Sequence, residues 1–373
     1  LTVQNCPALR ELRVGYQSFY AFSRLVLENL HALESVVVDE YCFRHASGAQ
    51  FVDLPSLKKV DVGRYCFAQG RQSCGSLVVR NCAAFEEVVV GDDSCCYATL
   101  CLENLPQLRV VDVGSNCFAL QAEMKVTNQA KLETIQVGDN SFSYTGDAPA
   151  TPCVFCVKEC PLVKELRVGN GAFKSYGVFE LTSVPLLQSV AIGQECFANV
   201  ESFMLSSLSG LQSIIIDEKS FSGSESFLLT QCISVKELQI ASNTFVNATS
   251  FTVESLPSLE VISIPSYSFT NVTNLQLVGL NKLKNVSIAE NSFSRQMGIF
   301  VLKNCPLVKG LSIGSTSLRY FKGLQLEGVP ALESLEIGNE CFMYVNEVKL
   351  IGLNGLMSVE IGMNSFTQHK NSY

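Results

Sequence analysis

The chain has 373 residues, of which 47% are hydrophobic and 17% are charged, and its net charge is −8. This apolar content supports a large buried core and excludes a disordered chain. The acidic balance argues against nucleic-acid binding, which normally needs a basic patch. No apolar run reaches the length of a membrane-spanning helix, so we expect no membrane insertion within this segment. No basic segment precedes an apolar core at residue 1, so no signal peptide is expected there.

A repeat of about 24 residues runs along the whole sequence. The string "ALESVVVDEYCF", which ends at Phe43, returns as "SLKKVDVGRYCF", "GLQSIIIDEKSF" and "ALESLEIGNECF". Ten of the 14 spacings between the repeat anchors are 24 residues, and the others are 28, 23, 31 and 25. The 15 anchors are Phe19, Phe43, Phe67, Cys95, Phe118, Phe142, Phe173, Phe197, Phe221, Phe245, Phe269, Phe293, Leu318, Phe342 and Phe366.

Each repeat predicts two short strands. The stretch (V/I)-x-(V/I) before the anchor alternates with period two, and so does the stretch (F/L)-x-(L/V) after it. A glycine such as Gly63 usually follows the first strand, and we expect it to allow a tight bend. A proline near the next strand makes the other corner rigid. In the second coil we expect these side chains to point inward: Leu25, Leu27, Leu30, Leu33, Val36, Val38 and Phe43.

One coil of this length cannot offset its own ordering entropy of about 1–2 kcal/mol per residue. Stacked coils bury their apolar side chains on both sides, so stability comes from the interfaces between coils. We therefore predict one continuous all-β solenoid over residues 1–373, with 15 coils, two short parallel strands per coil and little or no α-helix. The anchor residues are expected to form a buried aromatic column that is core and not a ligand site.

The strings "NCPALRELRVGYQSF" and "VPALESLEIGNECF" resemble the leucine-rich repeat superfamily. Within it, they are similar to the BspA-like repeats of microbial and protist cell-surface proteins. The resemblance covers essentially the whole chain. It implies a right-handed parallel coil and an extracellular or cell-surface location.

A longer period of three coils is also present. Five cysteines occupy the leucine position of the "NLP" corner in every third coil: Cys6, Cys82, Cys160, Cys232 and Cys305. Duplication of a three-coil unit explains this period, and a lateral contact that recurs every third coil is the alternative. Insertions follow the third, sixth and twelfth coils. We expect the first two of these segments, Ala68–Ser76 and Ser143–Pro152, to be loops that bulge from one side.

The 16 cysteines do not predict a disulfide framework. Stacked strands are about 4.8 Å apart, so cysteines three coils apart lie beyond the roughly 7 Å Cα separation that a disulfide allows. Cys42 and Cys66 share a position in adjacent coils and are candidates for a disulfide. Cys95, Cys96 and Cys117 form a second possible group, and we expect Cys101 and Cys156 to face outward.

No pattern predicts enzyme chemistry, a cofactor or a metal site. The string "CVFCVKEC" resembles half of a zinc site, but no histidine lies near it to complete four ligands. The three histidines, His31, His45 and His369, are expected at the surface. No glycine-rich phosphate loop leads into a helix. We therefore expect no catalytic, cofactor-binding or metal-binding residues.

Three N-glycosylation sequons occur, at Asn247, Asn271 and Asn285. Their number matches chance, but Asn247 and Asn271 occupy the same loop position one coil apart. Both are therefore candidate glycosylation sites on a secreted protein, together with Asn285.

The outer face of the first strand is the most informative surface, because parallel strand ladders carry the recognition surfaces of solenoids. Its outward positions are charged in the first half of the chain and rich in serine from 263 to 312. We predict a contact face around Arg13, Asp61, Asp112 and Arg167, and a merely solvated face is the alternative.

The leading functional hypothesis is a non-enzymatic extracellular or cell-surface adhesion or recognition module. A structural protein that assembles into a fibre or coat and an intracellular interaction scaffold are the alternatives. The expected partner is a protein or glycan ligand, or copies of the chain stacked end to end. Both ends fall inside a coil and carry no polar cap, so we expect a fragment of a longer array.

Overall fold

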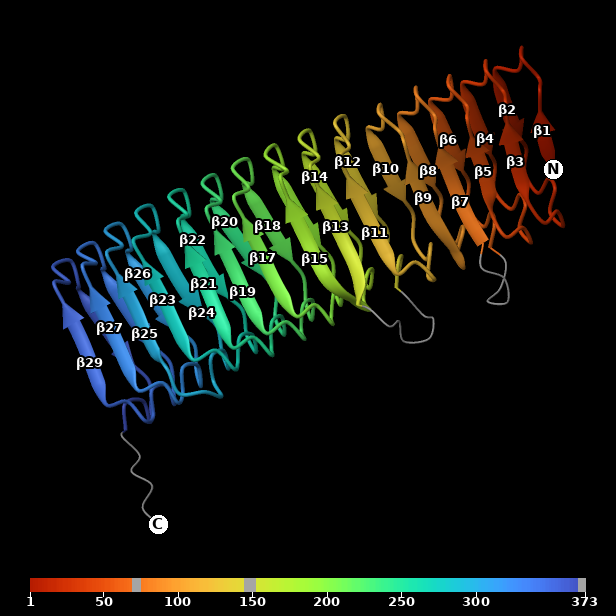
Figure 1. Cartoon of the computed structure of the whole chain (residues 1–373). Helices are drawn as coiled ribbons and strands as arrows, with labels where there is room; N and C mark the ends of the chain where they lie inside the picture. Colours follow the sequence, from red (N-terminus) through yellow and green to blue (C-terminus); the bar gives the residue numbers. More distant parts are fainter. Residues whose placement is uncertain (69–74, 144–151, 368–373) are drawn as a thin grey trace. The chain divides into compact units, whose positions relative to one another are not determined.

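The computed structural model describes residues 1–68, 75–143 and 152–367. The described residues form short strands joined by turns, with no helix among them. The chain divides into two compact units, Leu1–Val184 (unit 1) and Pro185–Tyr373 (unit 2). Each unit is a parallel β-solenoid in which strands of the same kind stack side by side (Figure 1). The predicted all-β repeat solenoid is confirmed.

Unit 1 has a first sheet, built from the strands that precede the anchors, and second strands that follow the anchors. The first sheet contains β2 (Glu11–Val14), β4 (Ser35–Val38), β6 (Lys59–Val62), β8 (Glu87–Val90), β10 (Val110–Val113), β12 (Thr134–Val137) and β14 (Glu165–Val168). The second strands form two sheets, β1 (Thr2–Gln4), β3 (Leu25–Glu28), β5 (Ala49–Val52), β7 (Gly75–Arg80) and β9 (Ala98–Glu103) in one, and β11 (Glu123–Thr127), β13 (Cys153–Lys158) and β15 (Tyr176–Thr182) in the other.

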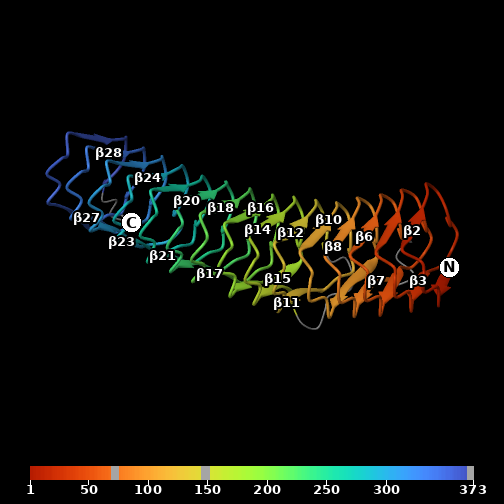
Figure 2. The same ribbon diagram turned by 90° about the horizontal axis from the view of Figure 1, so that it is seen from above.

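Unit 2 repeats this plan with two sheets. The first contains β16 (Ser189–Ile192), β18 (Ser213–Ile216), β20 (Glu237–Ile240), β22 (Val261–Ile264), β24 (Asn285–Ile288), β26 (Gly310–Ile313), β28 (Ser334–Ile337) and β30 (Ser358–Ile361). The second contains β17 (Ser202–Ser206), β19 (Ser226–Thr230), β21 (Ser250–Glu254), β23 (Asn274–Val278), β25 (Ile299–Lys303), β27 (Gly323–Glu327) and β29 (Glu347–Ile351). Figure 2 shows the two rows of strands on opposite sides of the coils.

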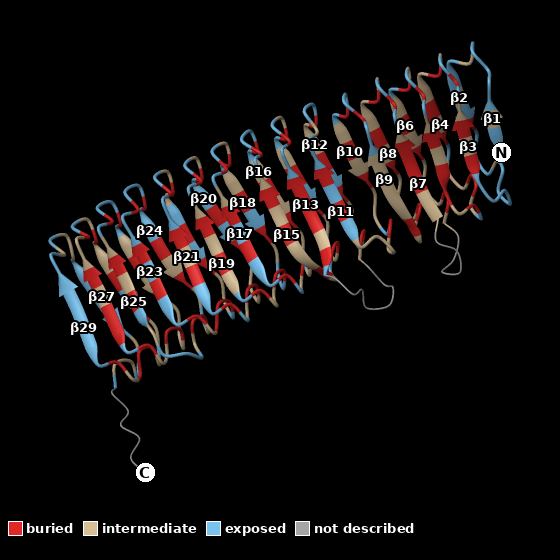
Figure 3. Cartoon of the chain, viewed as in Figure 1, coloured by how far each residue is buried: buried red, intermediate tan, exposed pale blue. Residues whose placement is uncertain are grey.

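The period of two along each strand places alternate side chains in the core. The seven side chains of the second coil that we expected to point inward are at most 1% exposed, from Leu25 to Phe43. Buried and accessible positions alternate in the same way along most strands (Figure 3). Adjacent strands pair in register, as in Val36↔Val60 of β4 and β6. Each coil therefore covers the apolar face of its neighbour.

The anchor residues form an aromatic column inside each unit. Phe43 and Phe67 stack in unit 1 with ring centroids 5.4 Å apart, and Phe221 and Phe245 stack in unit 2 at 5.4 Å with an interplanar angle of 1°. Most anchors are fully buried, as predicted, but Phe19 is 36% exposed and Phe366 is half-buried. The column is interrupted by Cys95 in unit 1 and by Leu318 in unit 2, and both of these residues are buried.

The corners differ from the prediction for glycine. The left-handed conformation is taken by non-glycine residues, including the anchor Phe67 at φ 50° and Tyr65 at φ 60°. Gly63 follows its strand without a left-handed φ, but a Cβ there would lie 2.8 Å from the backbone nitrogen of Glu40 in the preceding coil. The glycine is therefore needed because two backbones approach closely, and the proposed role in a tight bend is wrong.

Side chains just before the anchors form hydrogen bonds with backbone groups of the neighbouring coils. Ser94 accepts a hydrogen bond from the amide of Cys66 at 2.9 Å and donates one to the carbonyl of Gly63 at 2.7 Å. Ser141 does the same for Cys117 and Gly114 in a later coil of unit 1. Buried backbone groups need partners, which explains why the position before an anchor takes serine, threonine or cysteine in every coil but one, where it is Ala172.

The segments Ala68–Ser76 and Ser143–Pro152, predicted to be bulging loops, lie outside the described residues except at their ends.

Candidate functional site

The predicted contact face lies on the outer side of the first sheet of unit 1. Strand pairing places its outward residues in one row, in the order Arg13, Val37, Asp61, Val89, Asp112, Gln136 and Arg167. The four predicted residues therefore share a row but are not in contact. Since neighbouring strands are about 4.8 Å apart, consecutive members of the four lie about 10 Å apart.

The two arginines at the ends of the row are paired within their own strands. Nε of Arg13 lies 2.6 Å from Oε1 of Glu11, and Nη2 of Arg167 lies 2.6 Å from Oε1 of Glu165. Both pairs come from the string "ELRVG", which occurs in the first and seventh coils. Each arginine therefore presents a locally neutral pair to solvent.

The centre of the row is acidic. Nζ of Lys59 lies 3.5 Å from a carboxylate oxygen of Asp61 and 3.5 Å from one of Glu87, so one ammonium serves two carboxylates. Asp112 is half-buried, and no cation of the described residues forms an ion pair with it. Burial raises the pKa of the Asp112 carboxyl, and the nearby carboxylates of Glu87 and Asp92 raise it further. We call Asp61, Glu87 and Asp112 the acidic centre.

A second charged row, which the sequence reasoning missed, runs beside the first sheet of unit 1. The residue just before each first strand alternates in sign from coil to coil. This charge ladder contains Arg10, Glu34, Lys58, Glu86, Arg109, Glu133 and Lys164. Lys58 pairs with Glu34 at 2.9 Å and Lys164 with Glu133 at 3.2 Å. The sequence itself contains the pattern that indicates this ladder, because basic and acidic residues alternate at this position from one repeat to the next.

The cations of the charge ladder lower the pKa values of its carboxylates. The hydrogen bond from Lys58 lowers the pKa of the Glu34 carboxyl, and hydrogen bonds from Arg109 and Lys164 lower that of Glu133. Opposite charges therefore face each other between every two neighbouring coils. Opposite charges at facing positions of neighbouring strands are favourable, so the ladder stabilises the observed pairing of the coils.

Cys42 and Cys66, the candidates for a disulfide, do not form a reactive site. Cys42 and Cys66 are both free thiols, and they donate to different carbonyls, those of Gly15 at 3.0 Å and Asp39 at 3.1 Å. Their pairing under oxidising conditions stays a prediction. Burial raises the pKa of the Cys66 thiol to about 12. A thiol that stays protonated at neutral pH is a poor nucleophile and a poor metal ligand.

The two cysteines expected to face outward differ from each other. Cys101 is half-buried, whereas Cys156 is only 6% exposed, so the expectation of exposure is wrong for Cys156. Its neighbours cover it, since its Sγ lies 3.6 Å from Oε2 of Glu180 in the next strand. Burial raises the pKa of the Cys156 thiol to about 11.

The three sequons lie in different surroundings in unit 2. Asn247 is exposed in the loop after Phe245. Asn271, one coil later, is half-buried, and its Nδ2 donates to the carbonyl of Val246 at 3.1 Å. Asn285 is exposed as the first residue of β24, on the outer face of the first sheet. Asn247 and Asn285 are therefore the more accessible acceptors.

The remaining predicted features give no site. Among the described residues, no group of three or more histidine, cysteine, aspartate or glutamate side chains is placed to hold a metal ion. His31 and His45 are exposed, as expected, and His369 lies outside the described residues. In the part of the chain that the structure describes, no helix is long and apolar enough to cross a membrane.

Stacked parallel coils with a charged outer face define a repeat solenoid, a class of protein that typically serves as a binding scaffold. Residues 190–302, in unit 2, match the BspA type leucine rich repeat region in six copies. Residues 190–302 therefore carry BspA-type leucine-rich repeats, and the resemblance of the repeat strings to this family is confirmed over that part of the chain. No curated protein and no solved structure is significantly similar to the chain.

Proposed function

We propose that the chain is a non-catalytic recognition module of an extracellular or cell-surface protein. In this proposal, the outer face of the first sheet of unit 1 binds a protein ligand, and the acidic centre contacts a basic patch on that ligand. The family supports a protein-binding role, and repeats of this family are common at cell surfaces.

The observation that carries the proposal is the uneven distribution of charge along the row. The arginines at both ends are neutralised by their own glutamates, whereas Asp112 has a raised pKa among carboxylates. A cation from a partner would relieve this repulsion, so complementary charge favours a basic ligand and speeds its association. Seven strands spaced about 4.8 Å apart span about 30 Å, which is the width of a standard protein interface of about 800 Å² per partner.

The test uses the 373-residue chain, labelled with a fluorophore, on an array of purified extracellular proteins that covers a wide range of isoelectric points. One variant reverses the acidic centre, Asp61→Lys with Asp112→Lys. The matched control, Glu336→Lys with Glu360→Lys, reverses two carboxylates at the same row position in unit 2.

We expect the chain to bind basic proteins, the acidic-centre variant to lose at least about tenfold in affinity, and the control to bind as the parent does. Binding that is equally strong in the acidic-centre variant would overturn the proposed face. Self-association of the chain, measured by light scattering, would instead support assembly into a fibre or coat.

A second candidate, an intracellular interaction scaffold, is favoured by the thiols. Cys66, Cys82, Cys117 and Cys232 are buried free thiols, and unpaired cysteines are more common in reducing compartments. Thiol titration of native protein with and without reductant separates the two candidates, since an equal count in both conditions supports the scaffold.

A further inference from the structure

Unit 1 has a break in its second row of strands. On the first-sheet side, β10 pairs with β12 over four residues, from Val110↔Thr134 to Val113↔Val137. On the opposite side, β9 is the last strand of one sheet and β11 is the first strand of the next, and the two are not paired. The coil that carries β9 spans 23 residues between its anchors Cys95 and Phe118, one fewer than the usual 24. The same two coils are therefore joined on one face and open on the other.

The break forms a groove with an apolar floor. The space between the two strands has a volume of about 300 Å³, which is in the size range of a ligand site. Leu100, Leu102, Met124 and Val126 line it from the strands. Leu100 and Leu102 are half-buried, whereas the residues that pair with them in β7, Leu77 and Val79, are fully buried. The open pairing therefore exposes core side chains between the strands.

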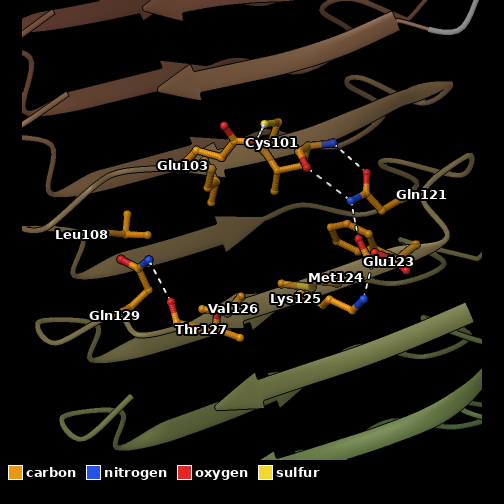
Figure 4. Close-up of a pocket in the computed structure, with 13 residues that line it drawn as sticks. Cys101, Glu103, Leu108, Gln121, Glu123, Met124, Lys125, Val126, Thr127 and Gln129 are labelled. Atoms are coloured by element: carbon orange, nitrogen blue, oxygen red, sulfur yellow. Dashed lines mark hydrogen bonds and ion pairs between the residues drawn. The ribbon is translucent and has the colours of Figure 1, made fainter. Parts of the chain in front are cut away.

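Backbone groups of both strands face this groove. The side-chain amide of Gln121 lies at one end, where it accepts from the backbone nitrogen of Leu100 at 2.8 Å and donates to the carbonyls of Leu100 and Glu123. At the other end, Nε2 of Gln129 donates to the carbonyl of Thr127 at 3.2 Å. Figure 4 shows these two glutamines at opposite ends of the groove. The side-chain amide of Gln121 therefore hydrogen-bonds to the edge of β9 at Leu100, as the backbone of a neighbouring strand would.

The backbone of Leu102 faces the same side as that of Leu100, because backbone groups alternate along a strand. Its N–H and C=O therefore point into the middle of the groove, where no strand pairs with them. The charged side chains that line the groove are the carboxylates of Glu103 and Glu123 and the ammonium of Lys125. Lys125 pairs with Glu123 at 3.1 Å, and Glu103 pairs with Arg80 of the preceding coil at 2.7 Å. The groove is therefore an apolar slot with free strand edges, and its rim carries two carboxylates that each have a cationic neighbour.

We propose that this groove binds an extended peptide segment of a partner protein. The peptide lies along β9 and forms main-chain hydrogen bonds with Leu102, as in strand addition to a sheet edge. One apolar side chain of the peptide enters the slot between Leu102 and Met124. A lysine or arginine beside that residue faces Glu103 and Glu123. The site lies on the second row of strands, so it is independent of the proposed contact face on the first sheet.

The test selects random heptapeptides, displayed on phage, with the whole chain as the target. The selected peptide is then synthesised in acetylated and amidated form, and its affinity is measured by calorimetry. The first variant is Glu103→Lys, and its matched control is Glu327→Lys. Both glutamates end a second strand and pair with a basic residue of the preceding coil, Arg80 at 2.7 Å and Lys303 at 3.0 Å. The second variant, Leu102→Trp, fills the slot, and its thermal unfolding is compared with that of the parent.

We expect peptides with an apolar residue next to a basic residue, and a loss of at least about tenfold in affinity for Glu103→Lys and for Leu102→Trp but not for Glu327→Lys. N-methylation of the peptide amides that face β9 is also expected to weaken binding at least about tenfold, because strand addition depends on main-chain hydrogen bonds. Selection of no peptide, equal binding to Glu103→Lys, or equal binding of the N-methylated peptide would overturn the proposal. Failure here leaves the acidic centre untouched, so the two proposals are tested separately.

Discussion

Arg109 and Glu133 occupy the same position in neighbouring coils, and Nε of Arg109 donates a hydrogen bond to Oε1 of Glu133 at 2.9 Å. On the other side, Nη1 of Arg109 lies 3.8 Å from Oε2 of Glu86 in the preceding coil. One arginine therefore lies between two glutamates along the solenoid axis, and the same alternation continues through the charge ladder. The stability of the folded chain should therefore depend on salt concentration and on pH.

Reversal of the charge at Arg109 is expected to lower the stability of the chain. Arg109→Glu places three carboxylates in adjacent coils, at Glu86, position 109 and Glu133. We expect a lower melting temperature that recovers partly as salt screens the repulsion. The control is Lys131→Glu, which makes the same change of charge at an exposed position two residues before Glu133. Equal melting temperatures for the two variants at low salt would contradict the role of the ladder.

The ladder also predicts weaker stability in acid. The folded-state pKa values of Glu34 and Glu133 are lowered by their cationic neighbours. Their contribution is therefore complete above the ordinary carboxyl pKa and disappears as the pH falls through the lower folded-state values.

Alkaline pH is expected to destabilise the chain through its buried thiols. Burial raises the pKa of Cys66 and Cys117 from an ordinary value of 9.0 to about 12. Stability is therefore complete below about pH 9 and falls as the pH rises toward 12, because the unfolded chain loses these protons first. Cys66→Ser removes one of these groups and keeps a residue that Ser94 shows to fit this position. Urea unfolding between pH 8 and 11 should show a smaller pH dependence for this variant, and an equal dependence would exclude the thiol as a cause.

The aromatic column supports a prediction about packing in unit 2. Phe221 is fully buried and stacks with Phe197 at 5.2 Å and with Phe245 at 5.4 Å. Phe221→Ala should therefore cost about 3–5 kcal/mol of unfolding free energy. Phe366→Ala is the matched control, since Phe366 is half-buried and should cost clearly less. Denaturant unfolding measures both, and similar losses would contradict the column as a continuous core.

Much of this fold could be predicted from the repeat. The alternation around Val36 and Val38 fixed which side chains face the core, and the structure buries both at 1% exposure or less. The left-handed conformation of Phe67 could not be predicted, because this conformation normally selects glycine or asparagine. The break between β9 and β11 had one sequence signal, the 23-residue spacing. That spacing does not say which strand pair opens, since pairing depends on both neighbouring coils.

The candidate contact face was only partly predictable. The row that contains Arg13, Asp61, Asp112 and Arg167 follows from the repeat register. The sequence could not show that Arg13 and Arg167 are neutralised within their strands, since this depends on side-chain geometry. The acidic character of the centre therefore emerged only from the structure.

The sequons give a prediction for secreted material. Asn247 is exposed, whereas the amide of Asn271 is engaged by the carbonyl of Val246. We therefore expect higher glycan occupancy at Asn247 than at Asn271 if the native protein is secreted, with Asn285 also accessible. Mass spectrometry of native peptides, before and after glycosidase treatment, measures the occupancy of each site. Higher occupancy at Asn271 than at Asn247 would contradict this ranking.

Carboxyl footprinting of the native protein tests the central claim most directly. The protein, in its native extract with its partner bound, is labelled at exposed carboxylates, and the labelling is compared with that of the purified chain. We predict that Asp61 and Asp112 are protected by the partner, while Glu336 and Glu360 at the same row position in unit 2 are labelled equally in both samples. Equal labelling of Asp61 and Asp112 in the bound and free states, with protection elsewhere on the chain, would contradict the acidic centre as the binding face.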